Sequence, residues 1–353
     1  MYGGPLGHRV DELMRLLPPK VVSISSANRG KSDLVTQKTE SSYYGVPVIH
    51  KPHWKWLIIV YFFLGGISGA SYVIASLAHL FGPNQDRRIA RAGRYLSFAT
   101  LLPCPVLLVL DLGQPKRFLN MLRIVKFRSP MSVGTWGLLF FSVFSTASTV
   151  VQAAQDGLLG QGRAPRLASA LPARGIAATG TPFGFFLASY TGVLLGATAV
   201  PLWAKNALLL GPLFLSSALS TATSAITLLL AVVPGTDRAT LERLERLERI
   251  TLATELGLLA ASRANLGPTA KPLLEGRTGQ LMRYGTVGAG LVVPLLLNAR
   301  PHHDKPGRRR TRTALTSLLV LGGGFILRYA VVVAGNASAD DPRATFEMTR
   351  IRS

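Results

Sequence analysis

The feature that most constrains this chain is a series of long apolar stretches separated by charged segments. A helix needs about 18 or more apolar residues to cross a hydrocarbon core of about 30 Å, and stretches of that length recur along the chain. Charged residues make up only 16% of the 353 residues, whereas a soluble domain carries roughly 25%. The sequence therefore predicts an all-α fold, a polytopic membrane helix bundle.

We expect about eight transmembrane helices, in a domain of residues 51–336 between a polar N-terminal tail (1–50) and a C-terminal tail (337–353). The sixth is unusual, because Glu255 lies between Arg249 and Arg263 and the apolar part is short. This helix must extend through the preceding "LERLERLERI" or be shielded by other helices. The expected spans are approximately 54–81, 93–112, 133–153, 183–203, 208–233, a sixth ending near Ser262, 284–297 and 314–334.

The charge of the chain is strongly positive, with a net charge of +22 from 39 Lys and Arg against 17 Asp and Glu. The cations lie mainly between the apolar stretches, where they face lipid head groups. No basic helix face or aromatic-basic platform of the kind that binds nucleic acid stands outside those segments. We therefore expect membrane lipid rather than nucleic acid as a partner. The cations divide too evenly between the two sides to orient the chain.

Redox metal sites are not expected in this chain. Of its six histidines only His79 lies within an expected span, so the two facing histidines that usually hold a membrane b-type haem are missing. Cys104 is the one cysteine, whereas an iron–sulfur cluster needs about four thiolates. The phosphate-binding motif of ATP-driven transporters is also absent from the sequence.

Ionisable residues inside a membrane are costly, and this makes Asp111, Glu255 and Arg328 candidates for function. Asp111 ends an apolar run, and Arg117 follows six residues later. The pair either serves proton transfer or pins the turn between two helices. Glu255 is either a member of a proton relay or the partner of Arg328 in a neutralised ion pair.

A group of cations follows Asp111 and precedes the next apolar run. It either docks an acidic partner protein or faces the lipid head groups. The candidate docking residues are Lys116, Arg123, Lys126 and Arg128.

Four segments resemble the NrfD/polysulfide-reductase membrane-subunit family: "HWKWLIIVYFFLGGISGASYVIA", "DLGQPKRFLNMLRIVKFRSPMSVGTWGLLFFS", "YTGVLLGATAVPLW" and "LRYAVVVAG". The resemblance spans roughly residues 44–336. It implies a haem-free, quinone-binding anchor of eight helices in the bacterial cytoplasmic membrane. It also implies a four-cluster ferredoxin-like iron–sulfur partner, often joined to a molybdopterin catalytic subunit.

The resemblance further implies a quinone pocket near the start of the first helix and in the fourth helix. The matching positions are His50, His53 and Trp54 at the first helix and Tyr190 in "SYTG". A Tyr hydroxyl or a His N–H can donate to a quinone carbonyl. The two histidines can equally be ordinary interface residues, and Tyr190 can make an interhelical hydrogen bond instead.

Three functions follow as hypotheses. In the first, the protein is a quinone-binding membrane subunit that exchanges electrons between menaquinone or ubiquinone and an iron–sulfur partner, with or without proton transfer. In the second it translocates ions or protons, as the Gly-rich helices and buried acids allow. In the third it is purely an anchor for its complex. The substrate of the catalytic partner is not readable from the sequence.

Overall fold

The computed structural model describes residues 54–83, 86–112, 122–123, 125–160, 162–233, 236–299 and 306–340. Those residues form helices and short connections, without a strand among them. The expected all-α bundle is therefore confirmed. His50, His53, Lys116 and Arg117 lie outside the described residues, as does most of each predicted tail.

The first half of the bundle is built around one buried helix. This helix, α2, begins just after Trp54 and contacts α3, α8 and α10 along its length. Pro103 begins α4 directly after the end of α3, so the two form one interrupted rod. The elements are α2 (Trp56–Phe81), α3 (Arg87–Leu101), α4 (Pro103–Asp111), α6 (Pro130–Gln155), α7 (Arg163–Ala170) and α8 (Ala173–Gly196).

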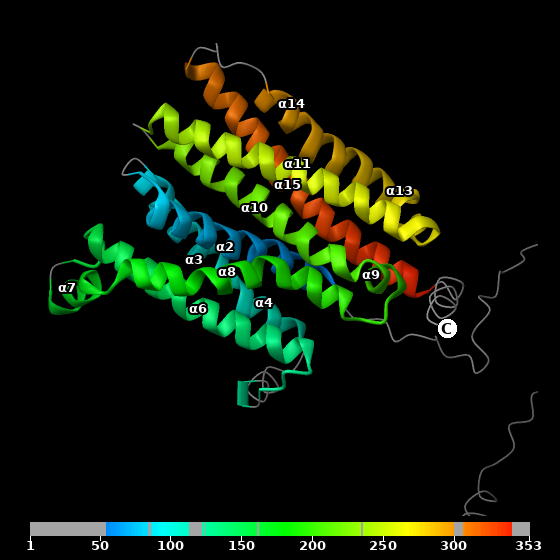
Figure 1. Cartoon of the computed structure of the whole chain (residues 1–353), viewed down its shortest axis with the longest axis horizontal. Helices are drawn as coiled ribbons and strands as arrows, with labels where there is room; N and C mark the ends of the chain where they lie inside the picture. Colours follow the sequence, from blue (N-terminus) through cyan, green and yellow to red (C-terminus); the bar gives the residue numbers. More distant parts are fainter. Residues whose placement is uncertain are drawn as a thin grey trace, which may run out of the picture. The chain divides into compact units, whose positions relative to one another are not determined.

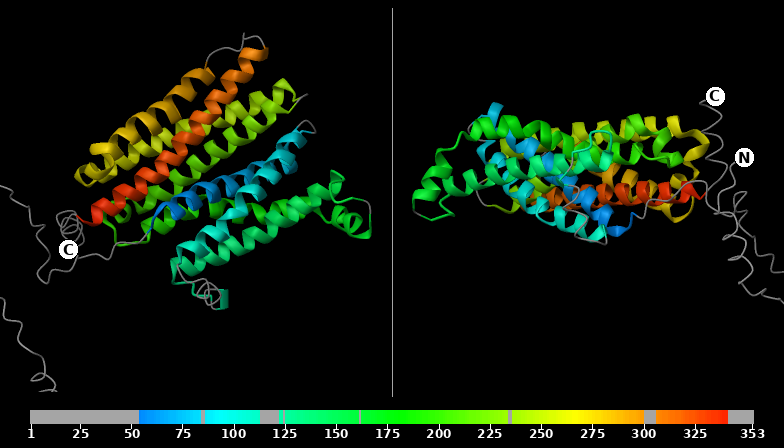
Figure 2. Two further views of the ribbon diagram at one scale, coloured as in Figure 1. Left: turned by 180° about the vertical axis from the view of Figure 1, so that it is seen from behind. Right: turned by 90° about the horizontal axis from the view of Figure 1, so that it is seen from below.

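The second half packs on the first through α10, which contacts α2, α8, α11 and α15. In Figure 1 the long helices run side by side, and Figure 2 shows the same arrangement from behind. The elements are α9 (Pro201–Lys205), α10 (Ala207–Val232), α11 (Arg238–Leu266), η2 (Gly267–Ala270), α12 (Lys271–Leu274), α13 (Gly276–Gln280), the π-helical η3 (Leu281–Val292), α14 (Val293–Ala299) and α15 (Pro306–Ala339).

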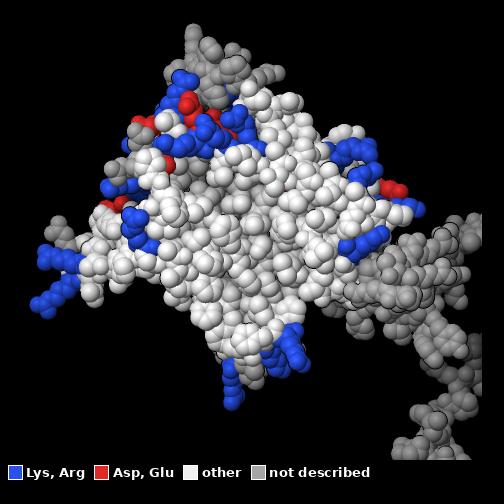
Figure 3. Space-filling view, viewed as in Figure 1, with Lys and Arg blue, Asp and Glu red and all other residues white. Residues whose placement is uncertain are grey.

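Six helical rods are long and apolar enough to cross a membrane. They are Trp56–Phe81, Arg87–Asp111, Pro130–Gln155, Ala207–Val232, Gly276–Ala299 and Arg310–Ala339. α8 and α11 occupy the places of the other two expected spans and pack against these rods. Length and composition alone thus support six of the eight expected crossings in the described part of the chain. Figure 3 shows a broad uncharged surface with Lys and Arg gathered at its margins.

Two elements differ from the sequence prediction. α8 begins at Ala173, well before the expected start near residue 183, and it ends at Gly196 because the chain turns there before Pro201 begins α9. α11 runs unbroken from Arg238 to Leu266, so the short sixth span does extend through its charged lead-in. Neighbouring helices cover Glu245 and Glu248 of this lead-in, which are 6% and 1% exposed.

Candidate functional site

A small cavity of about 70 Å³ lies where the start of α2, the end of α4, the start of α6 and the C-terminal half of α8 meet. Most of its wall is apolar or aromatic, with a few polar groups among them. This composition is typical of a small-molecule site. The lining residues are Trp54, Ile58, Tyr61, Phe62, Leu108, Asp111, Leu112, Met131, Gly134, Thr135, Tyr190 and Leu194. The structure therefore brings three predicted site residues, Trp54, Asp111 and Tyr190, into one cavity.

Trp54 is held in this wall by aromatic contacts. Its ring stacks on Trp203, with centroids 5.4 Å apart and an interplanar angle of 26°, and it meets Phe62 edge-on at 6.2 Å. Trp203 is fully buried, and its indole N–H donates to the carbonyl of Val331 at 2.9 Å. Trp54 thus rests on a side chain that is itself fixed by α15, which keeps this part of the wall rigid.

Tyr190 links α8 to the start of α6. Its hydroxyl donates to the carbonyl oxygen of Pro130, and its ring stacks on Phe186 at 4.6 Å. The interhelical hydrogen bond expected as an alternative role is therefore present. Gly134 permits this close approach, because a Cβ there would lie 3.1 Å from Tyr190 Cζ. The Tyr190 ring faces the cavity while its proton is engaged by the backbone.

Two polar groups of the cavity have no hydrogen-bond partner in the part of the chain that the structure describes. The first is the hydroxyl of Tyr61, a residue only 5% exposed, and the second is the carboxylate of Asp111. Lys55, at the start of α2, is the described cation whose charge acts on Asp111. Tyr61 was not predictable as a site residue, because α2 is apolar on nearly all sides and no polar face marks it. The cavity therefore contains one available donor and one available acceptor.

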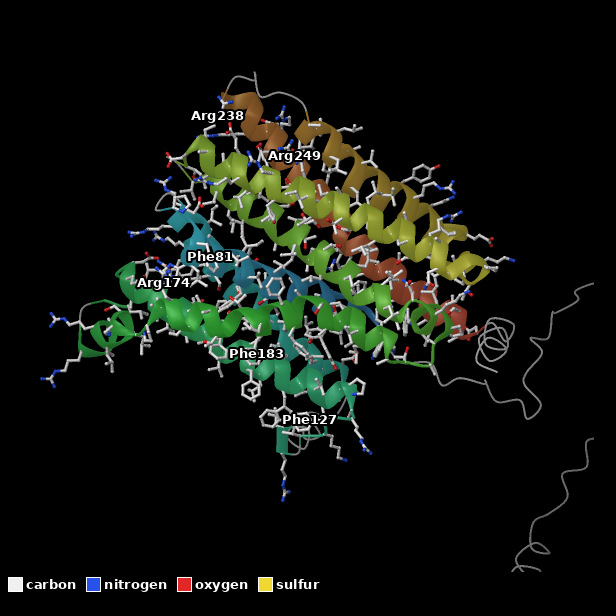
Figure 4. All side chains as sticks on the ribbon, in the orientation of Figure 1. Phe81, Phe127, Arg174, Phe183, Arg238 and Arg249 are labelled. Atoms are coloured by element: carbon white, nitrogen blue, oxygen red, sulfur yellow. The ribbon has the colours of Figure 1, made fainter. Side chains whose placement is uncertain are left out.

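Exposed cations lie in the chain just before α6, next to the cavity. Arg123, Lys126 and Arg128 are exposed, and Phe127 between them is 86% exposed. Figure 4 places Phe127 at the end of the bundle. Ser132 Oγ accepts from the backbone N–H of Lys126 at 3.0 Å, which ties this segment to the first turn of α6. The predicted docking residues that are described thus share the end of the bundle that carries the cavity.

Glu255 and Arg328 lie in the interior, 1% and 0% exposed. Within the described residues no direct ion pair joins them. Arg328 Nη1 donates to Ser217 Oγ at 3.1 Å and its Nε donates to the carbonyl of Phe62 at 3.2 Å, while Glu255 accepts from Ser220 Oγ at 2.8 Å. The two charges are therefore held through serines of α10.

A second acid continues this row of polar groups. Glu248 lies seven residues before Glu255 on α11, and it accepts hydrogen bonds from Ser224 of α10 and from Asn298 Nδ2 at 3.1 Å. Sequence reasoning placed Glu248 in a charged lead-in and missed its burial. In "LERLERLERI" the structure buries Glu245 and Glu248 but exposes Glu242, so the repeat itself carried no signal that separates the buried acids from the exposed one. Together these groups form a buried polar row along α10.

A second cavity, of about 220 Å³, lies between α10, α11, η3 and α15 and is almost entirely apolar. No group of three or more His, Cys, Asp or Glu side chains with metal-site geometry is found among the described residues. The expectation that haem and iron–sulfur clusters belong to another protein stays a prediction.

The family model described as "Polysulphide reductase, NrfD" matches residues 48–339. The chain belongs to the NrfD family. The predicted family is therefore confirmed, and this NrfD-family chain is a multi-pass membrane protein.

Two curated relatives support the assignment. Over 302 residues the sequence is 28% identical to a polysulfide reductase chain from Wolinella succinogenes. This alignment covers 80% of this protein and 94% of the relative. It is 26% identical over 91 residues to a selenate reductase subunit from Mesobacillus selenatarsenatis, over 26% of this protein and 21% of that one. The first match extends over nearly the whole relative, whereas the second is a local similarity.

Proposed function

We propose that this NrfD-family protein is the quinone-binding membrane subunit of an oxidoreductase complex and exchanges electrons between the quinone pool and an iron–sulfur partner. Family membership and the names of the two relatives, which are those of reductase components, support this proposal. The observation that carries it is the cavity that joins Trp54, Tyr61, Asp111 and Tyr190 at one end of the bundle.

The residues of this cavity suit a flat ring that carries two carbonyl oxygens. A quinone in this cavity would supply two-electron chemistry coupled to the uptake or release of two protons. The hydroxyl of Tyr61 donates to a carbonyl, and the carboxylate of Asp111 accepts or passes on a proton. The cavity holds only about 70 Å³, so a side chain must move on binding. Met131 is the best candidate, because it is flexible and 52% exposed.

The electron partner docks next to this cavity in our proposal. Arg123, Lys126 and Arg128 present positive charge there, and Phe127 adds an exposed aromatic side chain. A partner with an acidic surface would be attracted to this segment and oriented by it. We assign this docking place to a four-cluster ferredoxin-like subunit. That subunit would in turn bind a molybdopterin or other catalytic subunit. The complex would reside in the bacterial cytoplasmic membrane and use menaquinone or ubiquinone.

The kinetic test compares two tyrosines of α2 in the intact complex. Tyr61→Phe removes the donor from the cavity, so we expect the KM for a soluble quinone analogue to rise about five- to tenfold. Tyr72→Phe is the matched control, because Tyr72 lies on the same helix, is 1% exposed and donates to the carbonyl of Ile176 at 2.9 Å instead. Loss of this hydrogen bond should lower the Tm of the complex and leave the KM for the quinone analogue unchanged.

The anchoring function is distinguished by the same assay. Quinone turnover that is unchanged in Tyr61→Phe, Tyr190→Phe and His53→Ala would contradict a quinone site in this protein. A KM that rises equally in Tyr61→Phe and in the control Tyr72→Phe would indicate a general loss of structure rather than a lost contact with the quinone.

Proton transfer is a second candidate function, which the buried polar row along α10 favours. Carboxylates and hydroxyls in hydrogen-bond contact can relay protons through a helix bundle. Glu255→Gln in the complex reconstituted into vesicles should lower the protons moved per electron while electron transfer continues. Glu242→Gln, at an exposed position of α11, is the control. An unchanged proton-to-electron ratio in Glu255→Gln would exclude Glu255 from such a route.

A further inference from the structure

A third cavity, of about 530 Å³, lies at the opposite end of the bundle from the cavity at Trp54. α2 runs from Trp54 towards His79, and α6 runs from Met131 towards Asp156, so the two cavities lie at opposite ends of the same helices. The new cavity is lined by His79, Arg87, Arg88, Ala90, Arg91, Arg94, Gln152, Gln155 and Asp156. Four arginines of α3 therefore line this cavity together with a single carboxylate, that of Asp156.

That carboxylate is already engaged by its neighbours. Asp156 Oδ2 lies 2.8 Å from Arg91 Nε and accepts from the hydroxyl of Tyr95 at 2.6 Å. Its Oδ1 accepts from Gln152 Nε2 at 3.1 Å. Asp156 thus forms an ion pair with Arg91 and reaches Arg94 only through Gln152, so one carboxylate serves a cavity lined by four arginines.

Arg94 makes no direct ion pair among the described residues. It is 4% exposed, its Nη1 donates to Gln152 Oε1 at 2.7 Å, and its Nη2 has no hydrogen-bond partner among the described residues. A buried guanidinium is costly unless it is paired with charge. His79 adds a second buried nitrogen, Nε2, that also lacks a partner there. These groups point to a ligand that is negatively charged and rich in oxygen.

The surroundings of the cavity indicate a lipid. Phe81 and Leu77 at the end of α2 are 81% and 43% exposed, as expected of side chains that contact lipid tails. Figure 4 shows Phe81 and Arg174 at this end of the bundle, and Arg174 Nη2 donates to the carbonyl of Leu80 at 3.2 Å. The ends of membrane-spanning helices lie at the level of the head groups, where basic pockets between helices bind anionic lipids.

We propose that this cavity binds the phosphate group of an anionic phospholipid, with Arg94 and Arg87 as its main ligands. Guanidinium groups bind phosphate oxygens through paired, charge-assisted hydrogen bonds. Lipid binding here is independent of the proposed function, because the two cavities share no lining residue.

The test measures the Tm of the detergent-solubilised full-length protein during titration with phosphatidylglycerol, with phosphatidylcholine and inorganic phosphate as separate arms. Phosphatidylglycerol should raise the Tm, and Arg94→Gln and Arg87→Gln should each weaken its apparent affinity about fivefold. Arg87 is exposed on α3, so this variant keeps the test valid if Arg94→Gln fails to fold. Arg249→Gln, which removes an exposed charge from α11, should respond like the wild type.

Three results would overturn the proposal. The first is a phosphatidylglycerol response equal in the wild type and both cavity variants. The second is a response no larger than that to phosphatidylcholine. The third is an equal Tm rise with inorganic phosphate at the same concentration, which would assign the cavity to a free anion rather than to a lipid.

Discussion

At the scale of single residues, the walls of the cavity at Trp54 depend on how closely Gly134 approaches Tyr190. We expect Gly134→Ala to displace the Tyr190 ring, because the new Cβ would lie 3.1 Å from Cζ and 3.2 Å from the hydroxyl. Overpacking of this kind costs about 1–3 kcal/mol. The free energy of unfolding of the purified protein and the KM for quinone in the complex measure the effect.

Gly257→Ala is the matched control, since a Cβ on that glycine of α11 would meet nothing within 4 Å. This change should stabilise the protein slightly, by about 1 kcal/mol or less, through helix propensity. Equal stability of the two variants would show that the contact between Gly134 and Tyr190 does not shape the cavity.

Arg328 and Glu255 form the second residue-scale prediction. Arg328→Met leaves Glu255 without a compensating charge in the interior, and we expect it to lower the free energy of unfolding by about 3–5 kcal/mol. Glu255→Gln in the same protein should recover part of that loss, although Ser217 and Ser220 stand between the two groups. Additive effects in the double variant would mean that the two charges act independently.

At the scale of helices, the glycines fall into two classes that the sequence does not distinguish. A Cβ on Gly69 would lie 2.9 Å from the backbone nitrogen of Ala188, so Gly69→Ala must push α2 away from α8. Gly322 on α15 has open space around its Cα. We expect Gly69→Ala to lower the free energy of unfolding by about 1–3 kcal/mol and Gly322→Ala to leave it nearly unchanged, as measured by thermal unfolding. An equal loss of stability in the two variants would mean that the contact at Gly69 does not set the spacing between α2 and α8.

The helices were predictable where apolar length alone defines them. α2 and α10 begin and end within two residues of the expected spans 54–81 and 208–233. The start of α8 was not predictable, because Gly175, Gly180 and Pro182 are typical of a loop. There, packing against α2 and α6 overrides poor helix propensity.

The candidate site was predictable only in part. Trp54 and Tyr190 came from resemblance, and Asp111 came from the cost of a charge at the end of an apolar run. Tyr61 and Glu248 were missed, because burial on one face of a helix depends on which neighbours cover it. Over the most apolar window of α2, 78% of the residues are buried inside the bundle. The helix therefore has almost no lipid-facing side whose composition would mark the cavity-facing side in the sequence.

At the scale of the whole bundle, cations gather at both ends of the helices. Arg123, Lys126 and Arg128 lie at one end, and the arginines of α3 lie at the other. This distribution explains why the count of Lys and Arg did not orient the chain. It also separates two roles, since one end would receive the electron partner and the other would hold an anionic lipid.

The most direct test of the quinone site is photolabelling of the intact complex with a photoreactive quinone analogue, followed by peptide mapping. We predict labels between Trp54 and Phe62 of α2 or between Met131 and Thr135 of α6, and excess unlabelled quinone should suppress them. Labels confined to the apolar cavity near Leu213, Leu259 and Val331 would contradict a quinone site at Trp54.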